Sequence, residues 1–297
     1  MKSRYKSRKK ARQKENIKRK TGFFAKLSIF IITLLIILGL WGKFIEPNML
    51  TVHDYKITSS NLPKSFNGFR VVHISDMHYG TGYNEIRLEK LIKTTNDLNP
   101  DIVVFTGDLI DEKFNISDES KKKLITNLNN INSKYGKYAI VGNHDVNNKD
   151  FEKIISSSGF KLLKNSYDIV YNKDNEKIAL FGFDDTLLGT AKNDKLNDKT
   201  IKDTKYKIVL VHEPDYIDKF LNDFEISLVL AGHSHGGQAK LPKIRPFFLP
   251  EGSKTYYKSY YNVDNTDVYI SNGVGSSIVD FRLFSKPSIN LYRIYAK

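Results

Sequence analysis

Side chains that can bind metal ions follow five apolar runs of this 297-residue chain, in each case where a buried strand would end. They are carboxylates, imidazoles and one amide: Asp76, His78, Asp108, Asn143, His212, His233 and His235. Ligand groups of open α/β sheets gather where strands end and loops begin, so we expect these side chains to converge. The chain has no cysteine, which excludes disulfides, zinc fingers, iron–sulfur clusters and thiol nucleophiles.

The spacing within these motifs suits a metal site. Asp76 and His78 are two residues apart. In an extended chain they would point to the same side, where one ion can bind both. Gly107 lacks a Cβ, so the backbone and the Asp108 carboxylate can approach crowded ions. Asp108 has two oxygens and can bridge two ions that lie about 3.5–4 Å apart.

The charge of the predicted site indicates its chemistry. His233 and His235 supply two imidazoles that can serve two neighbouring ions, and Asn143 is a neutral ligand. The seven ligands carry a formal charge of only −2. Two divalent cations would therefore leave the centre positive even with a hydroxide present, and such a centre attracts phosphate. Donors without sulfur favour two divalent transition metal ions, namely Mn, Fe, Zn or Co.

The elements that must position these residues are readable from about Thr51 onward. Apolar runs predict strands at 70–75, 102–106, 138–141, 178–181, 208–211, 228–231 and 268–271. Helical patterns lie at 84–98, 117–131, 151–158 and 216–222. This alternation predicts a single α/β domain with a parallel or mixed sheet.

The N-terminal 45 residues have a different composition. Residues 1–26 carry twelve Lys or Arg and one acid, whereas the other 271 residues carry 35 basic and 32 acidic side chains. The net charge of +14 therefore belongs mainly to a short tail, and the near-neutral body argues against nucleic-acid binding. The apolar run within 27–45 predicts one transmembrane helix.

Three parts of the chain follow from this composition. We expect a basic cytoplasmic tail over 1–26, a membrane anchor over 27–45 and an external catalytic domain over 46–297, because positive charge favours the cytoplasmic side of a membrane. A cleaved signal peptide is the alternative, although no small-x-small cleavage site follows the apolar run.

The motifs D-x-H, G-D-x-x-D, G-N-H-D, H and G-H-x-H occur in this order and together resemble the pattern of the calcineurin-like metallophosphoesterase superfamily, over roughly residues 52–297. Segments 241–252 and 271–292 resemble its bacterial membrane-anchored or exported branch. The resemblance implies a four-layer αββα sandwich, in which two mixed β-sheets are flanked by helices.

The resemblance also implies a role for each site residue. One ion would be held by Asp76, His78 and His235, the other by Asn143, His212 and His233, with Asp108 between them. His144 would lie near the leaving-group oxygen as general acid or electrostatic stabiliser, with Asp145 as its orienting partner. Asp145 could instead cap a helix over 147–158. Asp111 could orient a ligand or be a plain loop carboxylate.

The implied activity is hydrolysis of phosphomonoester, phosphodiester or pyrophosphate bonds. Two ions, manganese among the candidates, would lower the pKa of a bridging water and orient the phosphoryl group for in-line displacement. The substrate would be a small phosphate ester or a lipid-linked one. The alternatives are a membrane-tethered scaffold without turnover and a nuclease, which the near-neutral body disfavours.

Two further features remain open at this stage. The loop 241–252 carries Ile244, Phe247, Phe248 and Leu249. It could pack on the core, or form an apolar lip that meets the bilayer or a lipid-linked substrate. His73 lies inside an apolar run, which predicts a hydrogen-bonded core histidine rather than a metal ligand.

Overall fold

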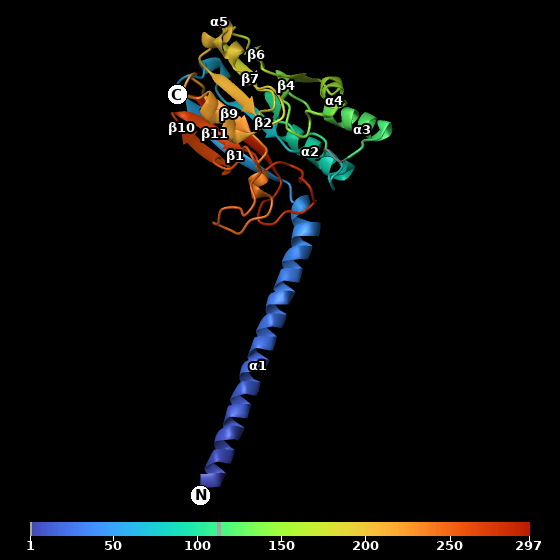
Figure 1. The fold of residues 1–297 in the computed structure, drawn as a ribbon. Helices are drawn as coiled ribbons and strands as arrows, with labels where there is room; N and C mark the ends of the chain where they lie inside the picture. The colour runs from blue at the N-terminus through green and yellow to red at the C-terminus, as the bar shows by residue number, and fades with distance from the viewer. Residues whose placement is uncertain (1, 112–113) are drawn as a thin grey trace.

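The strands of this protein form two mixed six-stranded sheets that pack face to face at the end of one long helix (Figure 1). The structure is a computed structural model and describes residues 2–111 and 114–297, with side chains outside 2–11 and 16–17. All seven predicted strands are confirmed to within two residues at each end.

The first sheet holds the strands that precede the first three motifs. Its order is β1 (Thr51–Ser59), β12 (Ser288–Ala296), β2 (Phe69–Ile74), β3 (Ile102–Phe105), β4 (Gly136–Ala139) and β5 (Phe160–Leu162). Strands β2 to β5 are parallel, while β12 runs antiparallel to β2 and parallel to β1. The carboxyl ends of β2, β3 and β4 therefore meet at one edge.

The second sheet holds the strands that precede the last two motifs. Its order is β10 (Tyr260–Val263), β11 (Thr266–Ile270), β9 (Leu228–Ala231), β8 (Lys207–Val211), β7 (Lys177–Gly182) and β6 (Ser166–Tyr171). The four central strands are parallel, and the edge strands β6 and β10 are antiparallel to their neighbours. The metal-binding motifs after β8 and β9 therefore also share one edge.

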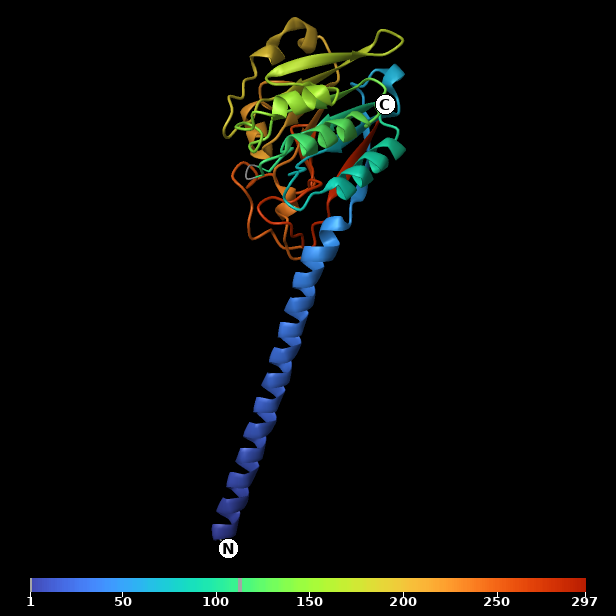
Figure 2. The same cartoon turned by 90° about the vertical axis from the view of Figure 1, so that its right-hand side faces the viewer.

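Helices cover the outer face of each sheet, which confirms the four-layer αββα sandwich. Three helices lie on the first sheet and are in front in Figure 2: α2 (Glu85–Asp97), α3 (Asp118–Asn129) and α4 (Phe151–Ser157). The second sheet is covered by η4 (Asp194–Asn197), α5 (Lys199–Lys202) and η5 (Pro214–Lys219). Alternate strand residues face opposite sides: Val72 packs among the helices, whereas Val71 packs in the core between the sheets.

Some elements differ from the sequence prediction. The helix expected at 216–222 is the 3-10 helix η5, which begins two residues earlier, at Pro214. Strands β1, β5, β6, β10 and β12 were not predicted. The prediction missed β1 because its half-buried and exposed residues alternate at the sheet edge, so that it lacks a continuous apolar run.

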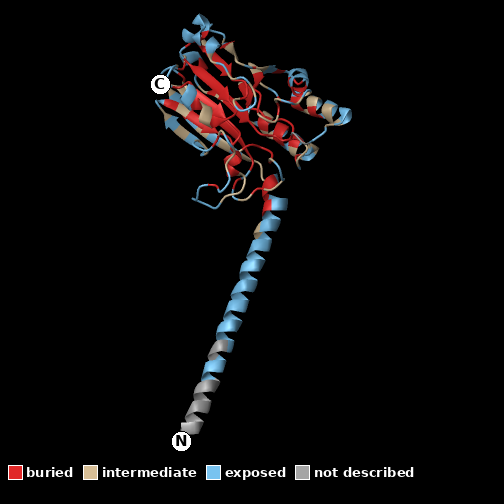
Figure 3. Ribbon diagram, in the orientation of Figure 1, coloured by how far each residue is buried: buried red, intermediate tan, exposed pale blue. Residues whose placement is uncertain are grey.

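The N-terminal helix α1 spans Lys2–Leu40 without a break at residue 26. Met1 and the side chains of 2–11 in the predicted tail lie outside the described residues. By length and composition α1 can cross a membrane as an anchor, or act as a signal sequence. It is followed by one π-helical turn, η1 (Trp41–Ile45), and a short 3-10 helix, η2 (Glu46–Asn48). Figure 3 shows the described part of α1 exposed and buried residues in the turns that follow it, which are Gly42 of η1 and Glu46 and Pro47 of η2.

Candidate metal centre

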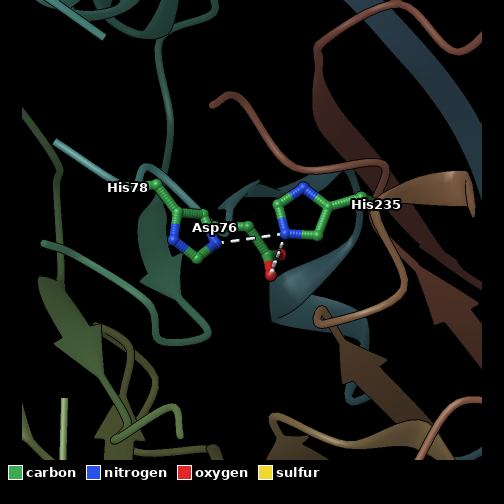
Figure 4. Close-up of side chains that lie close together, drawn as sticks. All are labelled: Asp76, His78 and His235. Carbon is green, nitrogen blue, oxygen red and sulfur yellow. Dashed lines mark hydrogen bonds and ion pairs between the residues drawn. The ribbon is translucent and has the colours of Figure 1, made fainter. Parts of the chain in front are cut away.

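Three predicted metal ligands from different sheets lie together at the edge where the two sheets meet (Figure 4). Asp76 and His78 follow β2 of the first sheet, and His235 follows β9 of the second. The Nε2 atoms of His78 and His235 are 3.1 Å apart, and His235 Nε2 lies 3.5 Å from Asp76 Oδ1. All three side chains are buried, and one donor atom of each lies within 4.8 Å of the other two.

A second group of ligands shares Asp108 with the first. Asp108 Oδ2 lies 3.3 Å from His78 Nε2 and 3.3 Å from His212 Nε2. The Nδ1 atom of His233 lies 3.2 Å from His212 Nε2. One carboxylate oxygen thus stands between the two groups of imidazoles, as a ligand that bridges two ions must.

These donors fit a pair of divalent cations. Asn143 Oδ1 is buried and has no hydrogen-bond partner among the described residues, although a buried carbonyl oxygen ordinarily has one. It shares a cavity lining with Asp108 and His233. Imidazole, carboxylate and amide donors without sulfur are the set that Mn, Fe, Zn and Co accept. The buried His and Asp clusters therefore suit a dinuclear metal site.

Backbone carbonyls fix which nitrogen of two imidazoles faces the site. Thr106 O lies 2.6 Å from His212 Nδ1, and Glu251 O lies 2.6 Å from His233 Nε2. A carbonyl oxygen can only accept, so each of these nitrogens donates and the other carries the lone pair. In the neutral rings, the lone pairs of His212 Nε2 and His233 Nδ1 therefore face the cluster, which is the arrangement that metal-binding histidines need.

Burial and mutual attraction set the charge states of the ligands. Burial lowers the pKa of His78 and of His233 to about 4, so both imidazoles are neutral at pH 7. Burial favours the neutral forms of Asp108 and His212 as well. Their mutual attraction outweighs it, and lowers the pKa of Asp108 while it raises that of His212. Asp108 is therefore an anion in the centre of the site, whereas His212 must give up the proton on Nε2 before that nitrogen can bind a cation.

The ligand backbone corrects one expectation. Asp76 and His78 are not on an extended segment, because β2 ends at Ile74 and both have a positive φ. Five of the predicted ligands share this left-handed conformation: Asp76 (φ 53°), His78 (φ 45°), Asp108 (φ 61°), His233 (φ 66°) and His235 (φ 49°). Non-glycine residues adopt it rarely and at a cost of order 1–3 kcal/mol each. The sheet edge is therefore strained at the residues that aim the ligands.

Two glycines and one buried carboxylate hold the Asp108 loop in place. A Cβ on Gly107, whose φ is +92°, would lie 2.5 Å from the backbone nitrogen of Gly142. Asp145 accepts hydrogen bonds from the backbone N–H groups of Asp108 (2.7 Å), Leu109 (2.9 Å) and Gly142 (3.0 Å). Burial, with the nearby Asp108 carboxylate, raises the pKa of Asp145 to about 8. Through these contacts Asp145 fixes the backbone of the Asp108 loop to that of Gly142.

The helix-cap alternative for Asp145 is wrong. Helix α4 begins at Phe151, and Asp150 rather than Asp145 occupies its N-cap position.

The other predicted catalytic residue, His144, is partly buried and lines the cavity beside the cluster. Its backbone N–H donates to Asp108 Oδ1 at 2.9 Å, and its ring stands perpendicular to that of His78 with 4.7 Å between centroids.

Two groups next to the ligands bear on their orientation. Asp111 is buried, and its Oδ2 lies 3.9 Å from His78 Nδ1. Arg282, which the sequence analysis did not single out, is fully buried and donates to the carbonyls of Asn272, Gly275 and Ser285. Its Nη2 lies 3.4 Å from His235 Nδ1. Arg282 lies between the apolar residues Phe281 and Leu283 in the sequence. This position of a charged residue was the only sequence feature that could have indicated a buried arginine.

The cavity beside the cluster has a volume of about 430 Å³. Its lining includes five of the predicted site residues and an apolar wall formed by Phe248, Ile278 and Val279. In the loop 241–252, Ile244, Phe247 and Phe248 are exposed rather than packed on the core, whereas Leu249 is half-buried. The core-packing interpretation of these three residues is therefore wrong.

Comparison with known proteins places the site in a described family. A family model described as calcineurin-like phosphoesterase matches residues 69–237, from β2 to just beyond His235. The chain is 32% identical to the metallophosphoesterase YkuE of Bacillus subtilis, over 86% of this chain and 88% of that protein.

Two further relatives carry informative names. The chain is 30% identical to a Danio rerio protein named transmembrane protein with metallophosphoesterase domain, over 89% of this chain and 61% of that protein. It is 28% identical to the UDP-2,3-diacylglucosamine pyrophosphatase LpxG of Chlamydia muridarum, over 86% of this chain and 92% of that protein.

Proposed function

Because the chain belongs to the calcineurin-like phosphoesterase family and is a hydrolase that acts on phosphoester bonds, we propose that it hydrolyses a phosphomonoester, phosphodiester or pyrophosphate at a dinuclear metal centre. We place it in the membrane-anchored bacterial branch of the family, with its catalytic domain outside the cell. The observation that carries the proposal is the position of Asp108 between two clusters of buried imidazoles.

The ligand assignment follows the two clusters. Asp76, His78 and His235 would hold one ion, His212, His233 and Asn143 the other, and Asp108 would bind both. When bound, two divalent ions supply Lewis-acid stabilisation of phosphoryl charge and lower the pKa of a shared water. The strained backbone of the ligand residues keeps their donor atoms aimed at these positions before any ion arrives.

His144 is the group that we assign to the leaving oxygen. It lines the cavity beside Asp108, so its imidazole can reach a phosphoester held there. A proton donor at this place neutralises the developing alkoxide, which typically contributes about 10²–10⁴-fold. Asp145 acts indirectly, because its carboxylate binds the backbone of the Asp108 loop and thereby sets where His144 and Asp108 stand.

The shape of the cavity supports a lipid-linked substrate over a small phosphate ester. A phosphate at the ligand cluster would face the apolar wall formed by Phe248, Ile278 and Val279. The Chlamydia muridarum relative is named for a pyrophosphatase whose substrate carries acyl chains. A lipid phosphoester or pyrophosphate is therefore the substrate class that we favour.

The test uses the full chain in detergent micelles or nanodiscs. With Mn²⁺ it should cleave an aryl phosphate or an aryl phosphodiester, and a chelator should abolish the activity. Asp108→Asn should lower the rate of hydrolysis by more than about 100-fold. Loss of a residue that only supports a metal ligand typically costs about 10–100-fold, and Asp108 is itself a predicted ligand. Asp118→Asn is the matched control, because that carboxylate is exposed on α3. Metal analysis should find about two transition metal ions per chain, and fewer in the Asp108 variant.

The outcome also separates the alternatives. A protein that binds two ions but leaves a broad panel of phosphoesters intact would be the membrane-tethered scaffold. Cleavage of oligonucleotides, with affinity that falls steeply as salt rises, would indicate a nuclease.

A further inference from the structure

Exposed apolar side chains gather on two loops next to the metal centre. They are Leu241, Ile244, Phe247 and Phe248 in the first loop, and Ile278, Val279 and Phe284 in the second. We call these seven residues the rim. The side chains of Phe247, Ile278 and Phe248 are 81%, 70% and 69% exposed, so the folded domain gains little from them. Such a contiguous exposed patch marks an interaction surface.

The rim lies at the end of the domain from which α1 emerges. In Figures 1 and 2 the orange loop after β9 and the red loop before β12 both reach down beside the last turns of α1. A groove of about 870 Å³ separates the rim from that helix. Its lining includes Ile37, Leu38 and Trp41 of the N-terminal segment, and Pro242 and Phe284 of the two loops. The loops therefore reach the level of the apolar run in α1.

The two turns that follow α1, η1 and η2, are fixed to the second loop. The backbone N–H of Arg282 donates to Gly42 O at 2.9 Å, and the N–H of Ser285 donates to a carboxylate oxygen of Glu46 at 2.6 Å. Lys43 Nζ donates to Asp280 O at 3.1 Å. The domain thus cannot swing freely on its helix, and the rim keeps its position beside the run that crosses the bilayer.

The charges around the rim match a lipid headgroup layer. Lys240, Lys243 and Arg245 flank the apolar residues of the first loop and line a second groove beside it. Long basic side chains can place their charge among lipid phosphates while their stems lie against apolar groups. Trp41, at the base of α1, is a residue typical of the membrane interface.

We infer that the rim is inserted into the headgroup region of the bilayer that α1 crosses, so that the entrance to the metal centre opens onto that leaflet. Phe248, Ile278 and Val279 belong both to the rim and to the wall of the cavity beside the ligands. An amphiphilic substrate can therefore move from the leaflet along an apolar surface to the site. The choice of an amphiphile as substrate rests on the proposed function, whereas the position of the rim does not.

The position of the rim can be measured without any activity. Because the chain lacks cysteine, Ile244→Cys and Phe247→Cys each give one site for a spin label in full-length protein in nanodiscs of neutral and anionic phospholipid. Leu35→Cys on α1 is the membrane control. Tyr171→Cys, half exposed in the hairpin between β6 and β7, is the aqueous control.

Oxygen collides with labels in lipid and a nickel chelate with labels in water, so the ratio of the two collision rates is high for a label in the membrane. For the rim labels, we expect a ratio close to that of Leu35→Cys and well above that of Tyr171→Cys. Rim labels with the ratio of Tyr171→Cys would overturn the inference. So would rim labels that are shielded from both reagents, because they would indicate contact with a second copy or with another protein rather than with lipid.

A second readout concerns the substrate. The variant with both Ile244→Ser and Phe247→Ser should turn over an amphiphilic phosphoester in vesicles at least about tenfold more slowly than the unmodified chain, because two apolar side chains no longer enter the bilayer. Its turnover of a water-soluble aryl phosphate should not change, which also shows that it is folded. Equal turnover of the amphiphile by both proteins would count against delivery from the leaflet. An unmodified chain that is inert to both substrates would refute the proposed function and leave the label result standing.

Discussion

At the scale of single residues, the role of Asp111 behind His78 can be tested. Asp111 Oδ2 lies 3.9 Å from His78 Nδ1, on the opposite side of the ring from the ligand cluster. This distance is longer than a hydrogen bond, so Asp111 acts on His78 through its charge. Asp111→Asn should therefore raise the dissociation constant for Mn²⁺, but by less than the roughly 10–100-fold that loss of a hydrogen-bonded partner typically costs. Competition with a metal-binding dye measures this directly. The exposed Asp118→Asn variant should bind Mn²⁺ normally, and an unchanged affinity in Asp111→Asn would make Asp111 a plain loop carboxylate.

His73 gives a prediction about pH. It is fully buried, bonded to Thr106 Oγ1 (2.8 Å) and Tyr292 OH (3.3 Å), and burial lowers its pKa to about 3. The unfolded chain binds a proton there below about pH 6.5, whereas the folded chain does not, so stability falls as pH decreases below that value. Between pH 6.5 and 5 this contributes a loss of about 2 kcal/mol.

The comparison with His73→Gln isolates this contribution. Urea unfolding of both proteins, with a chelator present, should show that the free energy of unfolding of the unmodified chain falls more steeply between pH 7 and pH 5. Other titrating groups are common to both proteins and cancel in the difference. Parallel pH profiles would mean that His73 is protonated in the folded state.

The types of the site residues were predictable, but their geometry was not. Aspartate and histidine after apolar runs indicated a metal centre because strand ends meet at a sheet edge. The left-handed conformation of Asp76 and His78 left no trace in the sequence, since no glycine occupies either position. Nor did the sequence reveal Arg282, whose importance arises from contacts with residues brought together only by folding.

At the scale of elements, close packing of two loops places Asp108. A methyl group on Gly107 would meet the backbone of Gly142, which cannot move aside as a side chain can. Gly107→Ala should therefore lower the free energy of unfolding by more than the approximately 1–3 kcal/mol of backbone strain alone, and should weaken Mn²⁺ binding. Gly68→Ala is the matched control, because Gly68 has a similar φ of +83° and open space around it. Thermal and urea unfolding measure both variants. If Gly107→Ala and Gly68→Ala lower the free energy of unfolding equally, the contact between the two loops is unimportant.

The difference between fully buried and half-exposed strands explains which elements could be predicted from the sequence. Strands β2, β3, β8 and β9 are buried on both faces, so they are continuous apolar runs that stand out. Strand β1 is half exposed at an edge, and β5 has only three residues. Neither has a local pattern strong enough to separate it from a loop, and both depend on neighbours that are distant in the sequence.

At the scale of the whole molecule, the basic tail and the apolar run of α1 predict which side of a membrane the domain would occupy. Positive charge before the run favours a cytoplasmic N-terminus, so the catalytic domain should be external.

Because the chain lacks cysteine, single introduced cysteines can test this orientation. In spheroplasts, Tyr171→Cys should react with a membrane-impermeant maleimide, because that side chain is half exposed at the far end of the domain. Glu15→Cys, exposed in the basic part of α1, should react only after the membrane is permeabilised. The opposite pattern would reverse the orientation. An external domain released without its N-terminal residues would instead identify α1 as a signal peptide, and the rim would then have no anchor to hold it at the bilayer.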